Sequence, residues 1–596
     1  MGKILGIDLG TTNSCVSIYT DNEMRVLHLE ANKSTLPSVV QFEDRKRDKI
    51  VIGSLAKRKI LIKPNEVFAS VKSLMRDDEW KKDKNLVEKF TIEGSLLTPT
   101  DISSIILKEL VRLVNTNNEI ANETIDEYVI CVPANSTVYK QNIYEAAIKA
   151  GLCKSNENNE VLRDKNGNPL GVHILEEPTA AAIAYAQDKG FFAEGKKSES
   201  TLLVYDFGGG TFDVTILKVT PAEGSDSIEL NSSAKMPHFS VRSTKGIADL
   251  GGDSIDYVLM EIVAKQFYEQ YKIDLLDPKK DNQGNSPAKV KLAQTVLKEM
   301  AEEKKIYFSS GDDAVQFEHN CLIEDLENEI PCKLDIVVTR EEFLNAIKPL
   351  IDKTLDCVDS AIKAANITAD DINRIILVGG SSKAPWVRDA ISQKFSNPYN
   401  PQNQDTIVAM GAARYGAILS ESITNSGGET TGGSTSGSTG DGETEGTNID
   451  IPESKPIPPI IEQITTHHYG IEMQGGYFSP MVEKGLKFDT DNPEYSYTAL
   501  YSNPNDSGIL KIAVWTTQEE LEIVTQNDIK ISSSNVHAMK DNHRLFDYIG
   551  EYEVNIPKAP KGTVQIEITL TITSENTISV KAKVGDNEPQ LAEWKK

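Results

Sequence analysis

Short apolar runs alternate with longer segments of helical periodicity through the first 420 residues. The pattern predicts helices where apolar residues recur every three or four positions, as they do over 142–150 and 342–364. It predicts strands at the short apolar runs 1–9, 128–132, 201–206 and 374–378. Alternating strands and helices are typical of an α/β architecture, which we predict for residues 1–420.

The final part of the chain follows a different pattern. Apolar and polar residues alternate over 564–572 and again over 578–584, with a polar turn between the two runs. A period of two buries one face of an antiparallel hairpin and leaves the other in water. Similar runs recur between 469 and 514, so we predict an all-β sandwich over 463–596.

A segment of low complexity separates these two regions. Every residue of 426–447 is Gly, Ser, Thr, Asp or Glu. Such a segment has too little apolar surface to offset the entropy of ordering, so we predict a flexible linker over 421–462. The chain therefore divides into three predicted parts: 1–420, 421–462 and 463–596.

Composition narrows the class of protein. The chain has 596 residues, of which 39% are hydrophobic and 26% charged, as expected of a soluble protein with sizeable cores. Acidic residues outnumber basic ones by 89 to 63, and the net charge of -26 argues against nucleic acid or an anionic membrane as the main partner. We also expect no membrane span, because the sequence lacks a run of about 18 apolar residues.

Cysteine usage and the first residues bear on the compartment. The six cysteines show no CxxC spacing, which favours free thiols in a reducing compartment. Lys3 is the only charged residue before Asp8 interrupts the first apolar run, so we expect no secretory signal. Both features predict a cytoplasmic protein. The adjacent His467 and His468 do not predict a metal site, because neighbouring side chains on a strand point to opposite faces.

Two strand-ending segments share one chemical pattern. Segments 7–13 (IDLGTTN) and 205–211 (YDFGGGT) each close an apolar strand with Asp, an apolar residue, Gly and Thr. Glycine lets a backbone approach an anion closely, and successive N–H groups form an anion-binding nest. An aspartate at a strand tip suits Mg²⁺ held through water, since this ion gives up its hydration reluctantly. We interpret the segments as paired loops from two related lobes that hold phosphates between them.

Two further glycine segments have different interpretations. Residues 375–383 (IILVGGSSK) form a buried-type strand that enters a glycine turn, which would open space beside a nucleoside. Residues 190–197 (GFFAEGKK) nearly match a P-loop, but Lys197 stands where magnesium requires Ser or Thr, and a helical pattern precedes the segment. We therefore predict a solvated loop at 190–197.

Together these motifs resemble those of the seventy-kilodalton heat-shock chaperones (DnaK-like). The resemblance covers essentially all of 1–420 and runs through IDLGTTNSCV (7–16), VPA (132–134), EEPTAAAIAY (176–185), YDFGGGTFDV (205–214), LGGD (250–253) and ILVGGSSKAP (376–385). It continues more weakly through HYGIEMQGG (468–476) and IPKAPKGTVQIEITLTI (556–572). The resemblance implies an α/β actin-like, two-lobed ATPase domain with ribonuclease-H-like lobes, followed by an all-β sandwich that binds peptide.

The resemblance also assigns roles to single residues. It implies ATP or ADP with Mg as ligands, and Asp8 and Asp206 as the residues that hold the metal through water. Lys72 matches the lysine that contacts the attacking water and terminal phosphate, and Glu177 matches a glutamate beside magnesium; the full catalytic set is Lys72, Glu177, Asp8, Asp206 and Thr211. Charge stabilisation of the transferring phosphoryl group is most of this catalytic task. The remaining nucleotide-binding positions are Gly10, Thr11, Thr12, Asn13, Gly208, Gly209, Gly210, Glu302, Lys305, Ser309, Gly379, Gly380, Ser381, Lys383 and Asp405.

Some positions depart from the family pattern. The stretch after Pro133 lacks the arginine that, with the proline, couples nucleotide state to the second domain, and Lys140 or Gln141 stands near its place. Lys383 replaces an adenine-stacking arginine and lacks the flat guanidinium, so we expect weaker nucleotide binding. The family's short apolar linker is replaced by the low-complexity tract, in which 457–461 (IPPII) is the candidate substitute.

The β-domain departs as well. Gln474 and Leu500 align with the two arch residues that close over a bound peptide, and Leu510 aligns with the central apolar pocket. We expect no helical lid, because no helix-length amphipathic segment follows the β-domain pattern. A peptide held by β-loops alone should exchange faster than one under a lid.

These features predict an ATP-dependent chaperone that hydrolyses ATP to ADP and phosphate and binds extended apolar segments of unfolded polypeptides. The resemblance adds a J-domain co-chaperone and a nucleotide exchange factor as partners. Two alternatives stay open: a nucleotide-gated binding module for one dedicated client with weak interdomain coupling, and a metabolite kinase of the same actin fold. Peptide-stimulated ATPase activity would separate the chaperone from the binding module, and phosphate release without an acceptor would exclude the kinase.

Overall fold

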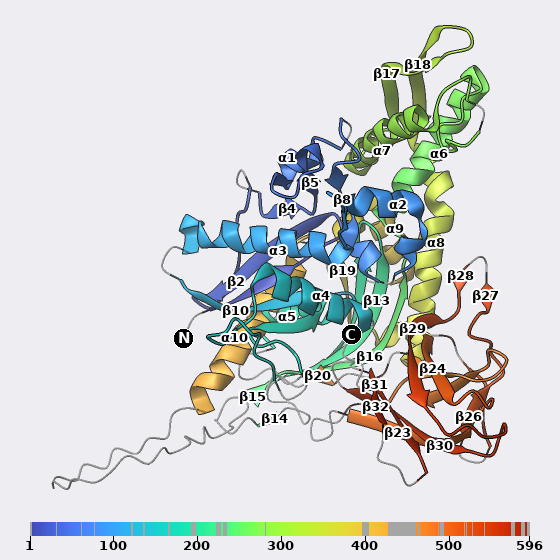
Figure 1. The fold of residues 1–596 in the computed structure, drawn as a ribbon. Helices are drawn as coiled ribbons and strands as arrows, with labels where there is room; N and C mark the ends of the chain where they lie inside the picture. Colours follow the sequence, from blue (N-terminus) through green and yellow to red (C-terminus); the bar gives the residue numbers. More distant parts are fainter. Residues whose placement is uncertain are drawn as a thin grey trace, which may run out of the picture.

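The computed structural model shows α/β regions beside a β-rich region (Figure 1). Most of the predicted linker, 427–460, and 192–197 of the near match to a P-loop lie outside the described residues. The structure describes residues 3–30, 33–60, 62–76, 78–120, 123–134, 137–164, 167–191, 198–221, 228–229, 235–280, 282–395, 404–426, 461–462, 465, 467–486, 488, 494–517, 519, 521–526, 529–540, 543–573, 578–585 and 590–592.

The first mixed sheet ends at the first glycine turn. Its strand order is β11-β10-β1-β2-β3, and β4 also pairs with β2. β1 runs parallel to β10 and antiparallel to β2, so Asp8 lies between Cys131 and Cys15 at the end of the central strand. The strands are β1 (Lys3–Asp8), β2 (Asn13–Thr20), β3 (Glu23–Val26), β4 (Thr35–Pro37), β10 (Ile125–Val132) and β11 (Val172–Glu176).

The second mixed sheet ends at the second glycine turn. Its strand order is β19-β12-β13-β16-β20. Asp206 on β12 lies opposite Asp213 on β13 and beside Val378 on β19, so this sheet also carries an aspartate at the end of a central strand. The strands are β19 (Arg374–Val378), β12 (Ser200–Phe207), β13 (Phe212–Thr220), β16 (His238–Ile247) and β20 (Ile461–Glu462).

Two helices connect the sheets through a shared apolar core. α5 (Glu177–Asp188) packs against β12 and β19, and α10 (Ile407–Ser426) packs against β1 and β10. The two helices also pack on each other so closely that a Cβ at Gly411 would lie 1.7 Å from the carbonyl oxygen of Ala180. Because one core includes residues of both sheets and both helices, the two aspartate-bearing strand ends are held in a defined relation.

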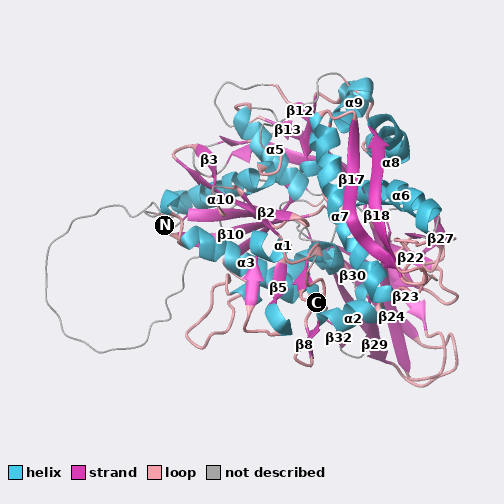
Figure 2. Cartoon of the chain, turned by 90° about the horizontal axis from the view of Figure 1, so that it is seen from above, coloured by secondary structure: helices cyan, strands magenta, loops and turns pink. Residues whose placement is uncertain are grey.

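Further helices cover the outer faces of the sheets. α3 (Pro99–Asn115) and α4 (Thr137–Ala150) share a core with the first sheet. α6 (Gly252–Tyr271), α7 (Pro287–Ser310) and α8 (Arg340–Ala364) share a core with the second. The β17–β18 hairpin (Ala314–Asp325 and Ile330–Thr339) lies along α7 at the upper end of the molecule (Figures 1 and 2).

Smaller elements complete this part of the chain. The helices are α1 (Ser54–Lys57), α2 (Lys84–Phe90) and α9 (Pro385–Lys394). The strands are β5 (Val40–Phe42), β6 (Ile50–Ile52), β7 (Val67–Phe68), β8 (Thr91–Ile92), β9 (Ser95–Leu96), β14 (Ile228–Glu229) and β15 (Lys235–Met236).

The C-terminal region is built from two four-stranded sheets with an apolar core formed by both. One sheet has the order β22-β21-β24-β29, with β21 (His468–Glu472), β22 (Phe478–Val482), β24 (Ile509–Thr517) and β29 (Asp547–Asn555). The other has the order β23-β30-β31-β32, with β23 (Glu494–Ser502), β30 (Gln565–Thr573), β31 (Ile578–Val584) and β32 (Gln590–Ala592). Between β24 and β29 lie two small hairpins, β25 (Ile523–Gln526) with β26 (Ile529–Ser532) and β27 (Met539–Lys540) with β28 (His543–Arg544).

β16 contacts the part of the chain that follows the predicted linker at two points. β20 pairs in parallel with β16, with Ile461 beside Phe239 and Glu462 beside Ser240. Farther along the chain, His467 is buried, and burial followed by the charge of Lys245 on β16 lowers its pKa to about 3. Residues 457–460 of the candidate apolar linker lie outside the described residues. Its last residue, Ile461, is described and pairs with β16.

The element types predicted from periodicity are confirmed. The predicted strands are β1, β10, β12 and β19, and the predicted helices lie within α4 and α8. The predicted C-terminal hairpin is β30–β31, whose register runs from Ile566 opposite Val584 to Ile572 opposite Ile578. α10 continues to Ser426, and the division of the chain near 420 stays a prediction.

Within the described residues, no helix is both long enough and apolar enough to cross a membrane.

Candidate active site between the two sheets

The two predicted glycine turns meet. A Cβ added at Gly209 would lie 2.2 Å from Oγ1 of Thr12, and one at Gly210 would lie 3.4 Å from Cγ2 of Thr11. The threonine side chains of the first turn therefore contact the backbone of the second, and only glycine permits this approach at Gly209. Gly10 is equally tight, since its Cβ would lie 2.1 Å from the carbonyl oxygen of Asn13.

Four carboxyl groups gather behind the turns: Asp8, Glu177, Asp206 and Asp213. Burial, and then the charge of Glu177, raises the pKa of Asp8 and that of Asp213 to about 7. The same two causes raise the pKa of Asp206 well above its ordinary value. Carboxylates this close together in a low dielectric ionise fully only when positive charge offsets them, so the cluster has the electrostatics of a cation site.

These residues fit a hydrated cation. Within the described ranges, no three His, Cys, Asp or Glu side chains lie close enough together to hold a metal ion directly. Asp8 and Asp206 stand at the ends of central strands in separate sheets, a spacing that suits an ion carrying its own water.

Lys72 supplies a fixed positive charge at this cluster. Its Nζ lies 2.6 Å from Oε1 of Glu177, and the two side chains are only 7% and 12% exposed. Burial acts to lower the pKa of Lys72, but the charges of Glu177 and Asp8 outweigh it, so the pKa is raised and the ammonium stays protonated. Lys72 belongs to a short 3-10 turn (Val71–Met75) that follows Ser70 in the left-handed conformation (φ 56°).

Helix α7 brings the predicted nucleoside residues to the same cleft. Glu302 pairs with Lys57 of α1 at 3.0 Å, a contact between the two α/β regions. Lys305 pairs with Asp256 of α6 at 2.7 Å and donates to the carbonyl of Gly252 at 3.1 Å. Ser309 donates to the carbonyl of Lys305 one turn earlier. Glu302, Lys305 and Ser309 are three and four positions apart, so they lie on one face of α7.

The third glycine segment joins this group. Ser381 donates to the carbonyl of Gly208 at 2.8 Å, which ties the 379–383 turn to the second phosphate-type turn. Lys383 forms an ion pair with Asp405, and Gly380 lies against the same aspartate. A Cβ at Gly252 would approach both Oγ of Ser381 and Nζ of Lys305, so all three segments converge around Gly252.

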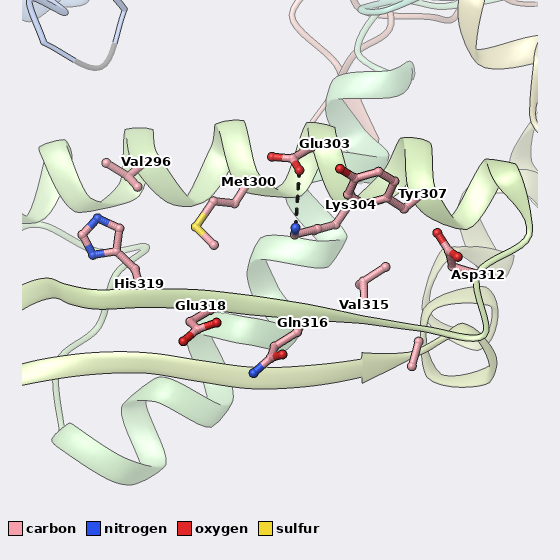
Figure 3. Close-up of a pocket in the computed structure, with 11 residues that line it drawn as sticks. Val296, Met300, Glu303, Lys304, Tyr307, Asp312, Val315, Gln316, Glu318 and His319 are labelled. Carbon is pink, nitrogen blue, oxygen red and sulfur yellow. Dashed lines mark hydrogen bonds and ion pairs between the residues drawn. The ribbon is translucent and has the colours of Figure 1, made fainter.

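A groove lies on the other side of α7. A cavity of about 640 Å³ lies between this helix and β17, and Figure 3 shows Glu303 and Lys304 in contact at its rim. Its lining includes Val296, Met300, Glu303, Tyr307, Val315 and His319. These helical positions are rotated away from Glu302 and Lys305, so the groove is separate from the cleft.

The structure adds residues that the sequence did not single out. Asp213 accepts a hydrogen bond from Thr211 and belongs to the carboxylate cluster. The sequence could have indicated Asp213, because residues two positions apart in extended chain point to the same side and Asp213 follows Thr211 at that spacing. Asp256 is 2% exposed and pairs with Lys305, and Lys57 sits on a four-residue helix. No pattern in the sequence marks Asp256 or Lys57, because each acts through a contact with a distant segment.

The three predicted peptide-binding residues do not form a cluster like that of the carboxyl groups and Lys72. Gln474 lies in the turn between β21 and β22 and accepts a hydrogen bond from Lys561 at 2.5 Å. Leu510 is 8% exposed in the core between the sheets, whereas Leu500 on β23 is 51% exposed. Since the β23 neighbours Ala499 and Tyr501 point into the core, Leu500 points outward, and its role with Leu510 stays a prediction.

A comparison with family models matches residues 4–427 to the model described as Hsp70 protein. The match includes both glycine turns, Lys72, Glu177 and α7. The chain belongs to the Hsp70 family. Members of the Hsp70 family are ATP-dependent chaperones, ATPases that bind ATP or ADP, typically with magnesium, and that generally bind unfolded polypeptides and co-chaperones.

The contact between Gly209 and Thr12 and the Lys72–Glu177 ion pair both lie within the range that the family model matches. The matched range ends at the last helix before the linker, so the match concerns the region that holds the cleft.

Proposed function

We propose that this chain hydrolyses ATP to ADP and phosphate in the cleft and uses the nucleotide state to control binding of extended apolar polypeptide in its β-domain. The observation that carries the proposal is the Lys72–Glu177 pair, buried at 2.6 Å beside the point where the two glycine turns touch. The ATPase part would then be an actin-like pair of lobes, with its boundary to the linker near 420.

The residues of the cleft divide the chemical task. Bound Mg²⁺ would offset phosphate charge, with Asp8 and Asp206 holding it through water. The amides of the turns around Thr11–Asn13 and Gly208–Thr211 would accept the phosphate oxygens. The Lys72 ammonium would stabilise charge on the transferring group, and Glu177 and Asp213 would orient water.

The nucleoside would lie between α7 and the 379–383 turn. Glu302 and Lys305 occupy one face of α7, Gly252 lies close to both Lys305 and Ser381 of the turn, and Lys383 of the same turn pairs with Asp405. Lys57 reaches Glu302 from the opposite region, so their ion pair would help to hold the two regions closed around the nucleoside. Lys57 is thus proposed to influence nucleotide exchange.

The path from the cleft to the β-domain is short. On β16, Gly246 lies opposite Asp213 of the carboxylate cluster, and the next residue, Lys245, is near the buried His467 of the β-domain. The same strand pairs with β20 at its other end. β16 therefore contacts Asp213, His467 and β20. A shift of this strand at Asp213 would displace both of the contacts with the C-terminal region.

Peptide capture in the β-domain is proposed to use backbone hydrogen bonds and an apolar pocket. Gln474, Leu500 and Leu510 remain the candidate residues, with Gln474 placed on an exposed turn. A J-domain co-chaperone and a nucleotide exchange factor are proposed partners. All six cysteines are unpaired, which supports a reducing, cytoplasmic location.

The test is ATP turnover with no added acceptor, measured with and without a permanently unfolded polypeptide. We expect phosphate release, stimulation by the polypeptide, and loss of both in Lys72→Ala and Thr211→Ala. Lys82→Ala, which removes an exposed lysine paired only with neighbouring Glu79, is the matched control. A rate that does not respond to polypeptide would favour the nucleotide-gated binding module. Conversion of ATP to ADP that requires an acceptor, with the phosphoryl group transferred to that acceptor and no phosphate released, would favour a kinase.

A further inference from the structure

A second buried ion pair lies directly behind the Lys72–Glu177 pair. Nζ of Lys140 lies 3.3 Å from Oε1 of Glu176, and the two side chains are 8% and 9% exposed. Buried charges are costly unless they are paired, so each side chain holds the other in place. Lys140 comes from the first turn of α4, and Glu176 ends β11.

Both residues are next to residues that contact the catalytic pair. Tyr139 precedes Lys140, and its hydroxyl donates to the carbonyl oxygen of Lys72 at 2.5 Å. Glu176 precedes Glu177, which accepts the hydrogen bond from Lys72. Two consecutive residues of α4 therefore support the Lys72–Glu177 pair: Tyr139 binds the backbone of Lys72, and Lys140 binds the side chain of Glu176, the residue before Glu177.

The elements that carry Lys72 and Glu177 have few hydrogen bonds of their own to fix these two side chains, so the contacts from α4 help to hold them. Lys72 lies on a short 3-10 turn, a kind of element with poorer hydrogen-bond geometry than an α-helix. Glu177 is the first residue of α5, and its N-cap, Glu176, makes no side-chain cap hydrogen bond. The carboxylate of Glu176 is used by Lys140 instead, so the start of α5 is fixed from α4.

The hydroxyl of Tyr139 is suited to a permanent donor role. Tyr139 is 5% exposed, and burial raises its pKa to about 12, so it keeps its proton at neutral pH. One helical turn later, Asn142 donates to the carbonyl of Met75 at 2.6 Å. Tyr139 and Asn142 thus bind the two ends of the turn that holds Lys72.

We propose that Tyr139 and Lys140 are positioning residues that hold Lys72 and Glu177 in the geometry needed for ATP hydrolysis. This inference rests on the proposed role of Lys72 and Glu177. Neither Tyr139 nor Lys140 is required to touch the nucleotide, so their loss should slow the chemical step more than it weakens ATP binding. Small displacements of reacting groups are sufficient for a large loss of rate.

The first experiment uses Tyr139→Phe, which removes one hydroxyl and keeps the ring. We expect the single-turnover rate of ATP hydrolysis to fall about tenfold while the Kd for ATP changes less than about twofold. Asn142→Ala is the matched control, since it removes the other hydrogen bond between α4 and the same turn without touching Lys72. It should lower Tm by a similar amount and leave the single-turnover rate within about twofold of the wild type.

The second experiment tests the buried ion pair. The double variant Lys140→Met with Glu176→Gln removes both charges and leaves no unpaired one, so it should fold. We expect a lowered single-turnover rate with little change in ATP affinity, and partial recovery of the rate in Lys140→Arg, which restores a cation. A wild-type rate in the folded double variant would overturn the role of Lys140.

Failure of this inference differs from failure of the proposed function. If Lys72→Ala abolishes turnover but Tyr139→Phe and the double variant keep the wild-type rate, the positioning roles are wrong and the catalytic assignment stands. If Lys72→Ala keeps the wild-type rate, the catalytic assignment itself is wrong. The positioning roles of Tyr139 and Lys140 are then wrong as well, because they depend on that assignment. An equal loss of rate in Tyr139→Phe and Asn142→Ala would show a merely structural role and also overturn the proposal.

Discussion

The candidate nucleotide site and the candidate peptide site are built in opposite ways. In the cleft, charged side chains from distant segments are buried and paired, as Lys72 and Glu177 show. In the β-domain, Gln474 makes an exposed contact with Lys561, and Leu500 and Leu510 point to different sides of β-structure. Phosphoryl transfer needs charges fixed in a low dielectric, whereas peptide capture uses backbone edges and apolar surface. A chemical site is therefore visible as a cluster of buried charge, and a peptide site is not.

The largest expected effect tests the cleft side of this comparison. Lys72→Ala or Thr211→Ala should lower ATP turnover at least about 100-fold, because a fixed charge or hydrogen-bond donor at the transferring phosphoryl group is lost. Turnover is measured as phosphate release, with thermal unfolding as the check on folding. Unchanged turnover in both variants would mean that the buried cluster is structural and that the comparison does not hold.

The next effect tests the apolar character of the β-domain. Leu510→Ala should destabilise this domain by about 2–4 kcal/mol, because it leaves a cavity between the two sheets. Leu500→Ala is the matched control and should change stability by less than about 0.5 kcal/mol, since its side chain faces water. Denaturant unfolding of the full chain, followed by hydrogen exchange of β30 amides, gives both values. Equal losses would show that Leu500 is buried by another part of the chain.

A smaller effect concerns the contact across the cleft. Lys57→Met removes the ion pair with Glu302 and should raise the release rate of ADP by about threefold, as expected for loss of a partly exposed pair. Stopped-flow displacement of a fluorescent ADP analogue measures the rate, and Lys59→Met on the same surface serves as the control. Slower release in Lys57→Met would mean that Lys57 hinders the bound nucleoside instead of closing the cleft.

The smallest expected effect concerns a carboxyl group outside the candidate site, Glu127, which is paired with His173 and Lys154. The hydrogen bond from His173, with the charge of Lys154, lowers the pKa of Glu127 to about 2. A carboxyl group whose pKa is lowered by folding stabilises the fold above its unfolded pKa, and this stability is lost as pH falls from about 4.5 toward 2. Glu127→Gln should therefore cost about 1 kcal/mol at pH 7 and much less at pH 3, as urea unfolding at the two pH values would show. An equal cost at both pH values would contradict the charge-based explanation.

Much of the fold could be predicted from periodicity. The strand ending at Asp8 and the one ending at Asp206 have continuous apolar runs, as buried strands require, and β30 and β31 alternate with a period of two. α10 was not among the predicted helices, and it continues into polar sequence as far as Ser426. The pairing of β20 with β16 left no local signal either, since it joins two segments far apart in the chain.

The site was predicted in part for a similar reason. Residues within motifs, such as Gly209 and Thr12, could be named because glycine and threonine at strand ends indicate anion binding. Asp256, Lys57 and Tyr139 could not, because each is defined by a partner more than one element away. Leu500 shows the opposite case, in which an alignment suggested a role but strand alternation directs the side chain outward.

The sequence by itself determined which strands and helices form and which residue types stand at the two glycine turns, because these depend on neighbours along the chain. Only the tertiary structure decided that Thr12 meets Gly209, that Lys72 is paired with Glu177, and that α4 supports both from behind. The physical reason is that charge pairing and burial depend on distance in space. A lysine on a short turn and a glutamate at a helix start acquire their electrostatic character only when the fold removes water from around both.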